Sequence, residues 1–408
     1  MPTSFAASLP RWIGTYILRP LGQIFLFIFG SALVLTLIAF AVSFLLRSDW
    51  HGIDILRVRP NIDLPEYLWR VTPNVWVDGI TLGFLYAVIA VGYTMVYGVL
   101  KFVNFAHSEI FMVGGVVGFE VLMRLDENRQ LGGIPPFLLI LLLIICGMII
   151  SGSLAVVVER VAYKPLRNAP RLVPLISAIG VSFFLQDFVR AFEALTRNEF
   201  KLTYPLNDVV FGDPPARFFD QRFPIDFSWL ALDFGKGTPT PMISPSLSVS
   251  IVIVIISALI MVVGLNYFVT GTKIGKGIRA VSQDQQTASL MGINVNLMIT
   301  LTFLIGGALG GAAGVLYGLR VTTVDPYIGF FPGLKAFTAA VLGGIGNITG
   351  ALLGGLLIGL LEAFASTLLP MFPALGTGYR DIFVFAILIL VLLFRPTGIL
   401  GKRADEKV

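Results

Sequence analysis

The residues that could perform catalysis or bind a metal ion are few and widely separated in this sequence. The chain has two histidines, His51 and His107, and one cysteine, Cys146. A zinc site needs several such ligands at short spacings, and Cys146 has no disulfide partner in the chain. The glycine-rich stretch 271–277 lacks the spacing of a phosphate-binding loop and has Gly277 where Ser or Thr would hold magnesium. The sequence therefore predicts no metal, no cofactor and no enzymatic activity.

Polar residues inside apolar segments are better candidates for function. A charge or an unpaired polar group is costly in hydrocarbon, so these side chains must face protein or a water-filled path. Such residues lie at 93–97 and again at 104–109. For residues 104–109, the alternative to a role in the path is an ordinary turn on the cytoplasmic side. The candidate substrate-path residues are Tyr93, Thr94, Tyr97, Asn104, His107 and Ser108.

Charged residues occur in two further apolar segments. Asp187, Arg190 and Glu193 follow one another at intervals of three. This spacing brings Arg190 within reach of either acid on a helix, and it favours an ion pair at the outer membrane boundary over substrate binding. Glu362 stands alone in its segment, and it either lies near an interface or bonds a neighbouring helix.

The composition indicates that membrane-spanning helices must position these residues. Of 408 residues, 56% are hydrophobic and 13% are charged, whereas soluble domains have about 25% charged residues. We therefore predict an all-α, polytopic integral membrane protein with about ten transmembrane helices, some of them broken or re-entrant. The net charge of +5 is not arranged in a basic stripe, so lipid and not nucleic acid is the expected environment.

The ten expected spans are apolar runs bounded by polar or charged residues. They cover residues 22–46, 77–99, 105–123, 136–158, 172–195, 247–268, 298–318, 334–346, 350–368 and 381–395. The eighth run is too short to cross a bilayer by itself, and it either spans or forms a re-entrant segment.

Lysines and arginines in the short loops give the orientation. They concentrate at 159–171, at 273–279 and after residue 395, and the ten-span count puts these segments and both termini on the cytoplasmic side. We divide the chain into an N-terminal extension, 1–75, with one added transmembrane helix and an outer charged segment, and a core, 76–408. The core has an outer loop, 196–246, which either caps a pathway or is a passive connector, and a cytoplasmic loop, 271–296.

Glycines recur at four-residue intervals in two of the segments. Such faces let helix backbones approach closely, which is how helices gain contact energy in lipid. Packing is the expected role, with a sliding surface for gating as the alternative. The residues concerned are Gly306, Gly310 and Gly314 in one segment and Gly350 and Gly354 in another.

Several motifs in this order resemble the permease subunits of bacterial ABC importers for branched-chain and other hydrophobic amino acids. The resemblance covers about residues 76–402. The motifs that carry it are GYTMVYG at 92–98, VNFAHSE at 103–109, YKPLR at 163–167, LISAIGV at 175–181, GIRAVSQD at 277–284 and the stretch 339–350.

The resemblance implies a subunit of the bacterial inner membrane that works with other proteins. Its partners would be a second, homologous permease, two cytoplasmic ATPase subunits that use the ATP, and a soluble binding protein outside the membrane. The family contacts its ATPase through Glu-Ala-Ala, three residues and Gly, and here Gln286, Thr287 and Ala288 precede Gly292, a departure at two positions. The candidate coupling residues are Arg279, Gln283, Asp284, Ala288 and Gly292.

The expected cargo is a neutral amino acid with a hydrophobic side chain, because apolar walls suit such a side chain and a few polar groups suit its backbone. A related importer of urea or short amides is one alternative. A secondary transporter or channel that needs no ATP is another, with Asp187 and Glu362 as ion sites. A membrane assembly scaffold is a third.

Overall fold

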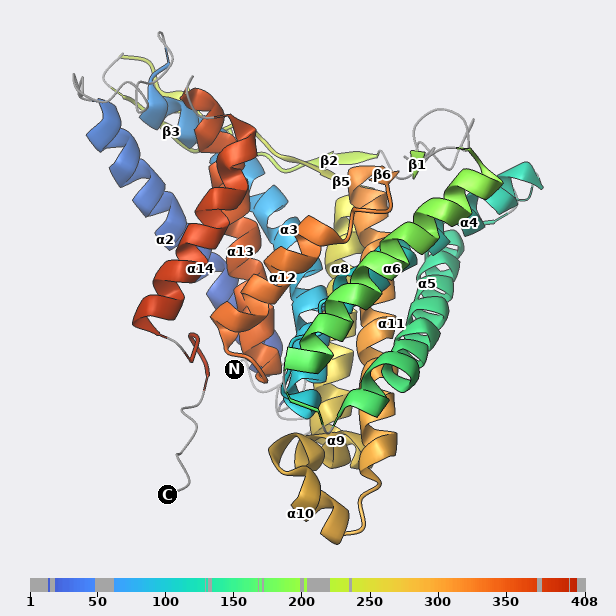
Figure 1. Cartoon of the computed structure of the whole chain (residues 1–408). Coiled ribbons are helices and arrows are strands. Elements are labelled where there is room, and N and C mark those ends of the chain that lie inside the picture. The colour runs from blue at the N-terminus through green and yellow to red at the C-terminus, as the bar shows by residue number, and fades with distance from the viewer. Residues whose placement is uncertain are drawn as a thin grey trace, which may run out of the picture.

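The structure is a computed structural model, and it shows a bundle of membrane-length helices (Figure 1). It describes residues 14, 19–47, 62–128, 130, 134–167, 169–170, 172–198, 202–203, 221–234, 237–372, 376–395 and 397–401. Residues 48–61, which include His51 and the first part of the outer charged segment, lie outside the described residues, as do most of the first half of the outer loop and the residues at both termini.

The helices follow one another across the bundle in alternating directions (Figure 1). Their bounds are α2 Arg19–Arg47, α3 Leu64–Leu100, α4 Ala106–Glu127, α5 Pro136–Val158, α6 Leu172–Thr196, α8 Val249–Gly271, α9 Lys273–Gln283, α10 Gln285–Leu290, α11 Val295–Val321, α12 Phe330–Gly343, α13 Ile348–Leu368 and α14 Arg380–Phe394. Shorter helical turns are the π turn η5 Glu159–Tyr163 and the 3-10 turns η6 Lys164–Leu166, η7 Leu369–Met371 and η8 Thr377–Tyr379.

The predicted fold class, an all-α polytopic membrane protein, is confirmed, but the predicted number of about ten spans is not. Seven of the described helices are long and apolar enough to cross a membrane. The predicted segments 105–123, 334–346 and 381–395 also form helices, namely α4, α12 and α14. However, α12 has only 14 residues and α14 only 15, fewer than the roughly 20 that a perpendicular crossing needs.

Three helices form the centre of the bundle. In α3 and α11, 89% and 72% of the most apolar stretch is buried, and in α13 the share is 67%. In contrast, α2, α5, α6 and α8 bury a third or less and lie around the outside. The added helix α2 packs on α3 and α13 through Ile24 and Ile28, and the Trp76 indole donates a hydrogen bond to the Thr36 hydroxyl at 2.9 Å.

Short strands lie at one end of the bundle and the small helices α9 and α10 lie at the other (Figure 1). The strands form three antiparallel pairs, which were not predicted, and two of these pairs lie wholly between α6 and α8. Their bounds are β1 Leu202–Thr203, β2 Arg222–Pro224, β3 Ala231–Leu232, β4 Thr240–Pro241, β5 Ser246–Ser248 and β6 Thr323–Val324. The pairing of Leu202 with Val324 ties the loop after α6 to the end of α11.

Glycines allow the central helices to touch backbone to backbone. A Cβ atom at Gly314 would overlap the Phe111 carbonyl of α4, and one at Gly354 would overlap the Ala339 carbonyl of α12. Gly350 lies equally close to the backbone of α12. Gly306 and Gly310 have more room, since an added Cβ would lie 3.4 Å and 3.5 Å from its nearest neighbours. The tight contacts on α11 are made instead by Gly307, Gly311 and Gly314.

The break between α12 and α13 is a turn built on left-handed glycines. Gly344 and Gly346 have φ angles of +104° and +91°, which only glycine adopts without strain. Asn347 then caps α13 by accepting a hydrogen bond from the Gly350 backbone at 3.2 Å. The backbone amides of residues 399 and 400 donate to the last carbonyls of α12 at 2.8 Å and 3.1 Å. The segment after α14 therefore satisfies carbonyls that a helix end leaves unpaired.

We predict that Gly314→Ala destabilises the protein while Gly264→Ala does not. The added methyl group at position 314 has no space beside α4, so the free energy of unfolding should fall by about 1–3 kcal/mol. Gly264 on α8 has no atom within 4 Å of an added Cβ, and alanine there favours the helix. Thermal unfolding in detergent measures the stability of both variants. Equal melting temperatures would contradict the close packing of α11 against α4.

Candidate functional site

The predicted path residues gather where α3 ends and α4 begins. The hydroxyl of Tyr163, from the turn η5, donates a hydrogen bond to Asn104 Oδ1 at 2.5 Å. The amide nitrogen of Asn104 and the hydroxyl of Thr94 are buried and have no hydrogen-bond partner among the described residues. Unpaired buried polar atoms are costly and uncommon. These two atoms leave the cluster with hydrogen-bonding capacity that no described residue uses.

His107 is enclosed between two glycines of neighbouring helices. Its imidazole lies against Gly92 of α3, where an added Cβ would overlap the ring, and faces Gly310 of α11. It also meets the Tyr93 ring edge to face, with 4.7 Å between the ring centroids. His107 is 1% exposed and its Nε2 atom has no partner in the described structure.

A narrow cavity adjoins this cluster. Its volume is about 10 Å³, which holds no more than about one water molecule. It has no space for an amino acid in this arrangement of the helices. The lining residues are Tyr93, Thr94, Tyr97, Val103, Asn104, Phe337, Ala340 and Ile345. His107 and Ser108 do not line it, and the Ser108 hydroxyl instead donates to the Phe105 carbonyl at 2.7 Å.

Glu109 is a buried carboxylate next to these residues that the site prediction did not include. Ser182 and Gln186 of α6 donate to its Oε1 atom at 3.1 Å and 3.0 Å. Its Oε2 atom has no hydrogen-bond partner in the described part of the chain. Two donors from α6 could not be anticipated from the sequence, because they are more than 70 residues away along the chain.

Glu362 bonds neighbouring helices, as one of its two predicted alternatives had it, and it belongs to a buried ionic network. Lys335 of α12 donates to Glu362 Oε1 at 2.7 Å, and the Tyr86 hydroxyl of α3 donates to Oε2 at 2.7 Å. Lys335 also lies 2.8 Å from a carboxylate oxygen of Asp381, and Arg380 lies 3.6 Å from Glu362. A lysine within an apolar segment, Lys335, was a sequence signal for a buried acidic partner, and the prediction did not use it.

The predicted pairing of Arg190 along α6 is not seen with Glu193. Both carboxylate oxygens of Glu193 are buried without a hydrogen-bond partner among the described residues. The Arg190 guanidinium donates to the Tyr327 hydroxyl at 3.4 Å. Asp187 is exposed on the outer side of the same helix.

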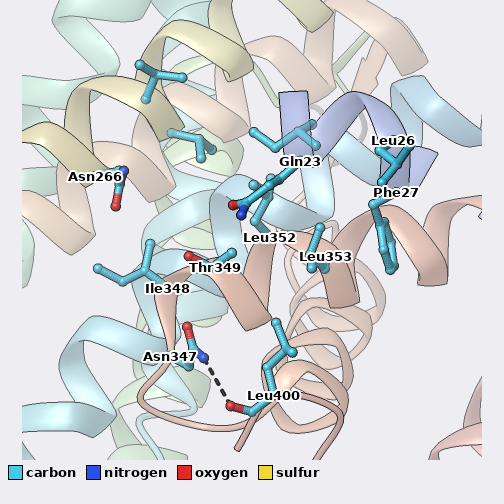
Figure 2. A pocket seen from close by; sticks show the side chains of 13 residues that line it. Gln23, Leu26, Phe27, Asn266, Asn347, Ile348, Thr349, Leu352, Leu353 and Leu400 are labelled. Atoms are coloured by element: carbon cyan, nitrogen blue, oxygen red, sulfur yellow. Dashed lines mark hydrogen bonds between the residues drawn. The ribbon is translucent and has the colours of Figure 1, made fainter. Parts of the chain in front are cut away.

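A second, larger cavity lies away from the predicted path. It is a groove of about 560 Å³ between α2, α8 and α13. Figure 2 shows leucines and Phe27 on its walls and the amides of Gln23, Asn266 and Asn347 around it. Asn347 is already engaged, since it donates to the Leu400 carbonyl at 3.1 Å. The groove shares no lining residue with the narrow cavity.

The predicted coupling loop folds into the two small helices that project beyond the bundle (Figure 1). Asp284 caps α10 by accepting hydrogen bonds from the backbone of Gln286 and Thr287 at 2.9 Å and 3.0 Å. Arg279 and Gln283 are exposed, whereas Ala288 is 4% exposed and packs inward. Ala288 is therefore placed to hold α10 against the bundle.

The end of α10 and the turn after it form an exposed apolar tip that sequence reasoning missed. Leu290 and Met291 are 88% and 78% exposed. Gly292 follows with a φ angle of +82°, a conformation that favours glycine. The Gln285 side chain donates to the Val99 carbonyl at 2.7 Å and so attaches α10 to the end of α3.

These features define the class as a polytopic, predominantly helical membrane protein with a polar cluster buried between its helices and a helical projection at one end. No group of metal-ligating side chains occurs in the described ranges. Residues 75–392 match the family described as the permease component of the branched-chain amino acid transport system. The chain belongs to this family, as the sequence resemblance predicted.

Individual relatives cover the same region. The high-affinity branched-chain amino acid transport system permease protein LivH of Salmonella typhimurium is 42% identical over 331 residues, which is 81% of this chain and 96% of the relative. BraD of Pseudomonas aeruginosa, which has the same description, is 40% identical over 332 residues, again 81% and 96% of the two chains. LivH of Escherichia coli K12 is 40% identical over 331 residues with the same coverage. Helix α2 lies before the matched region.

We predict that Tyr163→Phe lowers stability more than Tyr379→Phe. Removing the Tyr163 hydroxyl leaves the buried Asn104 side chain without its donor, which should cost about 1–3 kcal/mol. Tyr379 is 46% exposed, so water replaces whatever its hydroxyl contacts. Thermal unfolding in the same detergent tests this, and an unchanged melting temperature for Tyr163→Phe would show that the bond contributes nothing.

Proposed function

We propose that this chain is the transmembrane permease subunit of an ABC importer for branched-chain or other neutral hydrophobic amino acids. The observation that carries the proposal is identity of 40% or more to relatives that carry this description, over nearly the whole length of those relatives. The family match from 75 to 392 includes every predicted path and coupling residue.

The energy for uptake comes from other subunits in this proposal. A permease can favour one direction only when another component binds its two conformations with different affinity. Two cytoplasmic ATPase subunits, a second permease and a soluble extracytoplasmic binding protein supply that difference, and ATP is used by the ATPases. The chain itself needs no cofactor. This assignment rests on the family and on the lack of a phosphate-binding motif in the sequence.

The face that bears α9 and α10 is the cytoplasmic face in this proposal. It carries the exposed Lys273, Lys276 and Arg279, in agreement with the excess of cations in cytoplasmic loops. Helix α2 begins and α14 ends toward this same end of the bundle (Figure 1). Both termini are therefore assigned to the cytoplasm and all ten predicted segments to the bacterial inner membrane.

The substrate path runs beside the polar cluster at the start of α4. Thr94 and Asn104 supply unpaired polar atoms next to the narrow cavity, and a zwitterionic backbone needs such contacts. Because the cavity is so small, substrate passes only after the helices around Phe337 and Tyr93 move apart. In this proposal, the arrangement of helices described above is the one in which the path is closed.

Uptake by proteoliposomes tests the function directly. The permease is reconstituted with its second permease, the ATPases and the binding protein, and radioactive leucine, isoleucine, valine, urea and acetamide are supplied in turn. We expect ATP-dependent accumulation of the three amino acids and little of the amides. Preferential uptake of urea would identify an amide importer, and leucine accumulation by this chain alone would identify a transporter independent of ATP.

We predict that Leu290→Ser combined with Met291→Ser weakens binding of the ATPase subunits about tenfold, equivalent to about 1.4 kcal/mol. The reason is that both side chains are exposed at the tip of the projection, where a partner would bury them. Titration of the purified ATPase onto the permease in nanodiscs measures the affinity. Trp229→Ser, at a residue 74% exposed in the outer loop, is the control that should leave it unchanged. Equal affinities for all three proteins would place the contact elsewhere.

A further inference from the structure

The groove between α2, α8 and α13 is not used by the proposed substrate path. Its volume of about 560 Å³ is far above that of the water-sized voids that close packing leaves. One wall is open, since Leu26 on α2 is 77% exposed and Gln23 on the same helix is exposed. All three helices are long and apolar enough to cross a membrane. The groove is therefore open to the bilayer, and its contents come from there.

The polar lining residues of this groove are gathered at one end. Gln23 lies four residues after the start of α2, Thr349 follows the start of α13, and Asn266 lies five residues before the end of α8. Asn347, the cap of α13, lies beside them. The lining residues further into the membrane are all apolar, namely Ile24, Leu26, Phe27, Val262, Val263, Leu352 and Leu353. All three helices thus have the same order, polar toward the end that bears α9 and apolar toward the membrane interior.

The amides of Gln23 and Asn266 are available to a ligand. Figure 2 shows a hydrogen bond from Asn347 to the Leu400 carbonyl, and none between the other two amides and the lining residues. None of the lining side chains is charged. Helix α13 begins at this end of the groove, and the partial positive charge of a helix N-terminus favours an anion such as phosphate. The polar end therefore suits phosphate and ester oxygens, which accept hydrogen bonds from amides.

The size of the groove distinguishes a lipid from a protein helix as its occupant. A helix with its side chains is about 10 Å wide, so the volume of the groove would enclose only about 7 Å of one, which is fewer than two turns. An extended acyl chain is much thinner than a helix, so it fits along the groove. A small soluble molecule would need an aqueous entrance, whereas these walls belong to membrane-length helices. The groove therefore matches a molecule with a polar head and a long apolar tail.

We propose that this groove binds a diacyl phospholipid from the membrane leaflet on the side of α9 and α10. An acyl chain lies along Leu26, Phe27 and Leu353. The amides of Gln23 and Asn266 donate hydrogen bonds to the phosphate or the glycerol ester oxygens. Helix α2, which forms one wall, lies before the residues that match the family. The lipid site thus gives the added helix a role that is separate from the proposed transport function.

A photoactivatable phospholipid tests the site in the unaltered chain. The full-length protein, alone and in the complete transporter, is reconstituted in vesicles of phosphatidylethanolamine and phosphatidylglycerol. A fraction of the phosphatidylethanolamine carries a diazirine on one acyl chain. Irradiation follows extraction into detergent, so that only lipid that stays bound is joined to the protein, and mass spectrometry then locates the labelled residues.

We expect label on Leu26, Leu353 and their neighbours in the groove. Ile149 on α5, which is 61% exposed and outside the groove, should carry little label. Equal labelling of α5 and the groove would show ordinary surface lipid and would overturn the proposal. Labelling of the groove in the isolated chain but not in the complete transporter would show that a protein covers it, and would also overturn the proposal.

Replacing the two free amides tests the polar end of the site. Gln23→Leu combined with Asn266→Leu makes the groove more apolar, so an acyl chain alone would be held at least as well. If the amides hold the head of the lipid, the loss of two hydrogen bonds within the membrane should weaken retention of the phospholipid about tenfold. Native mass spectrometry of the full-length chain in detergent measures the bound phospholipid. Unchanged retention would overturn the proposal.

Filling the groove gives a further readout with a control on the same helix. Val263→Trp places a large side chain in the lining, whereas Ile256→Trp places it about two turns away at a position 52% exposed and outside the groove. We expect Val263→Trp to lose bound phospholipid about tenfold or more and Ile256→Trp to retain it. Equal retention by the two variants would overturn the proposal. The labelling is read in the unaltered chain, so a folding defect of a variant does not affect it, and none of these measurements depends on the transported substrate.

Discussion

Contact between helix backbones is the constraint on which this bundle depends. Helices in lipid gain little from the hydrophobic effect against one another, so their association relies on close packing. Gly311 and Gly314 bring α11 against α4 and α5, and Gly355 and Gly359 bring α13 against α3. These approaches leave no room for side chains between the helices, and they set where every other residue of the core lies.

Close packing also explains why the polar groups of the interior are so confined. His107 fits because Gly92 faces it without a side chain. The Asn104 amide is held by Tyr163, and the Lys335 and Glu362 charges are held by each other. Buried charges need such partners to offset their loss of water. Among the described residues, the interior thus contains a polar cluster with unpaired atoms beside a narrow cavity, and an ionic network whose main contacts are direct.

The sequence predicted the class of fold and the family because hydrophobic runs and ordered motifs are local signals. Residues 273–294 form α9, α10 and the turn that follows, and their role as a cytoplasmic coupling loop stays a prediction. Long-range partners were missed for a physical reason. Nothing near Glu362 in the sequence indicates Lys335 or Tyr86, and nothing near Glu109 indicates Gln186. The small cavity was equally hidden, because its size depends on how four separate segments pack. The exposure of Leu290 could not be predicted either, because it depends on how α9 and α10 fold together.

The helices α12, α13 and α14 are joined at both ends. Toward the outer side, Lys335 links Glu362 of α13 to Asp381 of α14. Toward the other side, the amides of residues 399 and 400 bond the final carbonyls of α12. Three helices that are fastened at two levels have little freedom to tilt separately. A change in the position of any one of these helices would therefore disturb the other two as well.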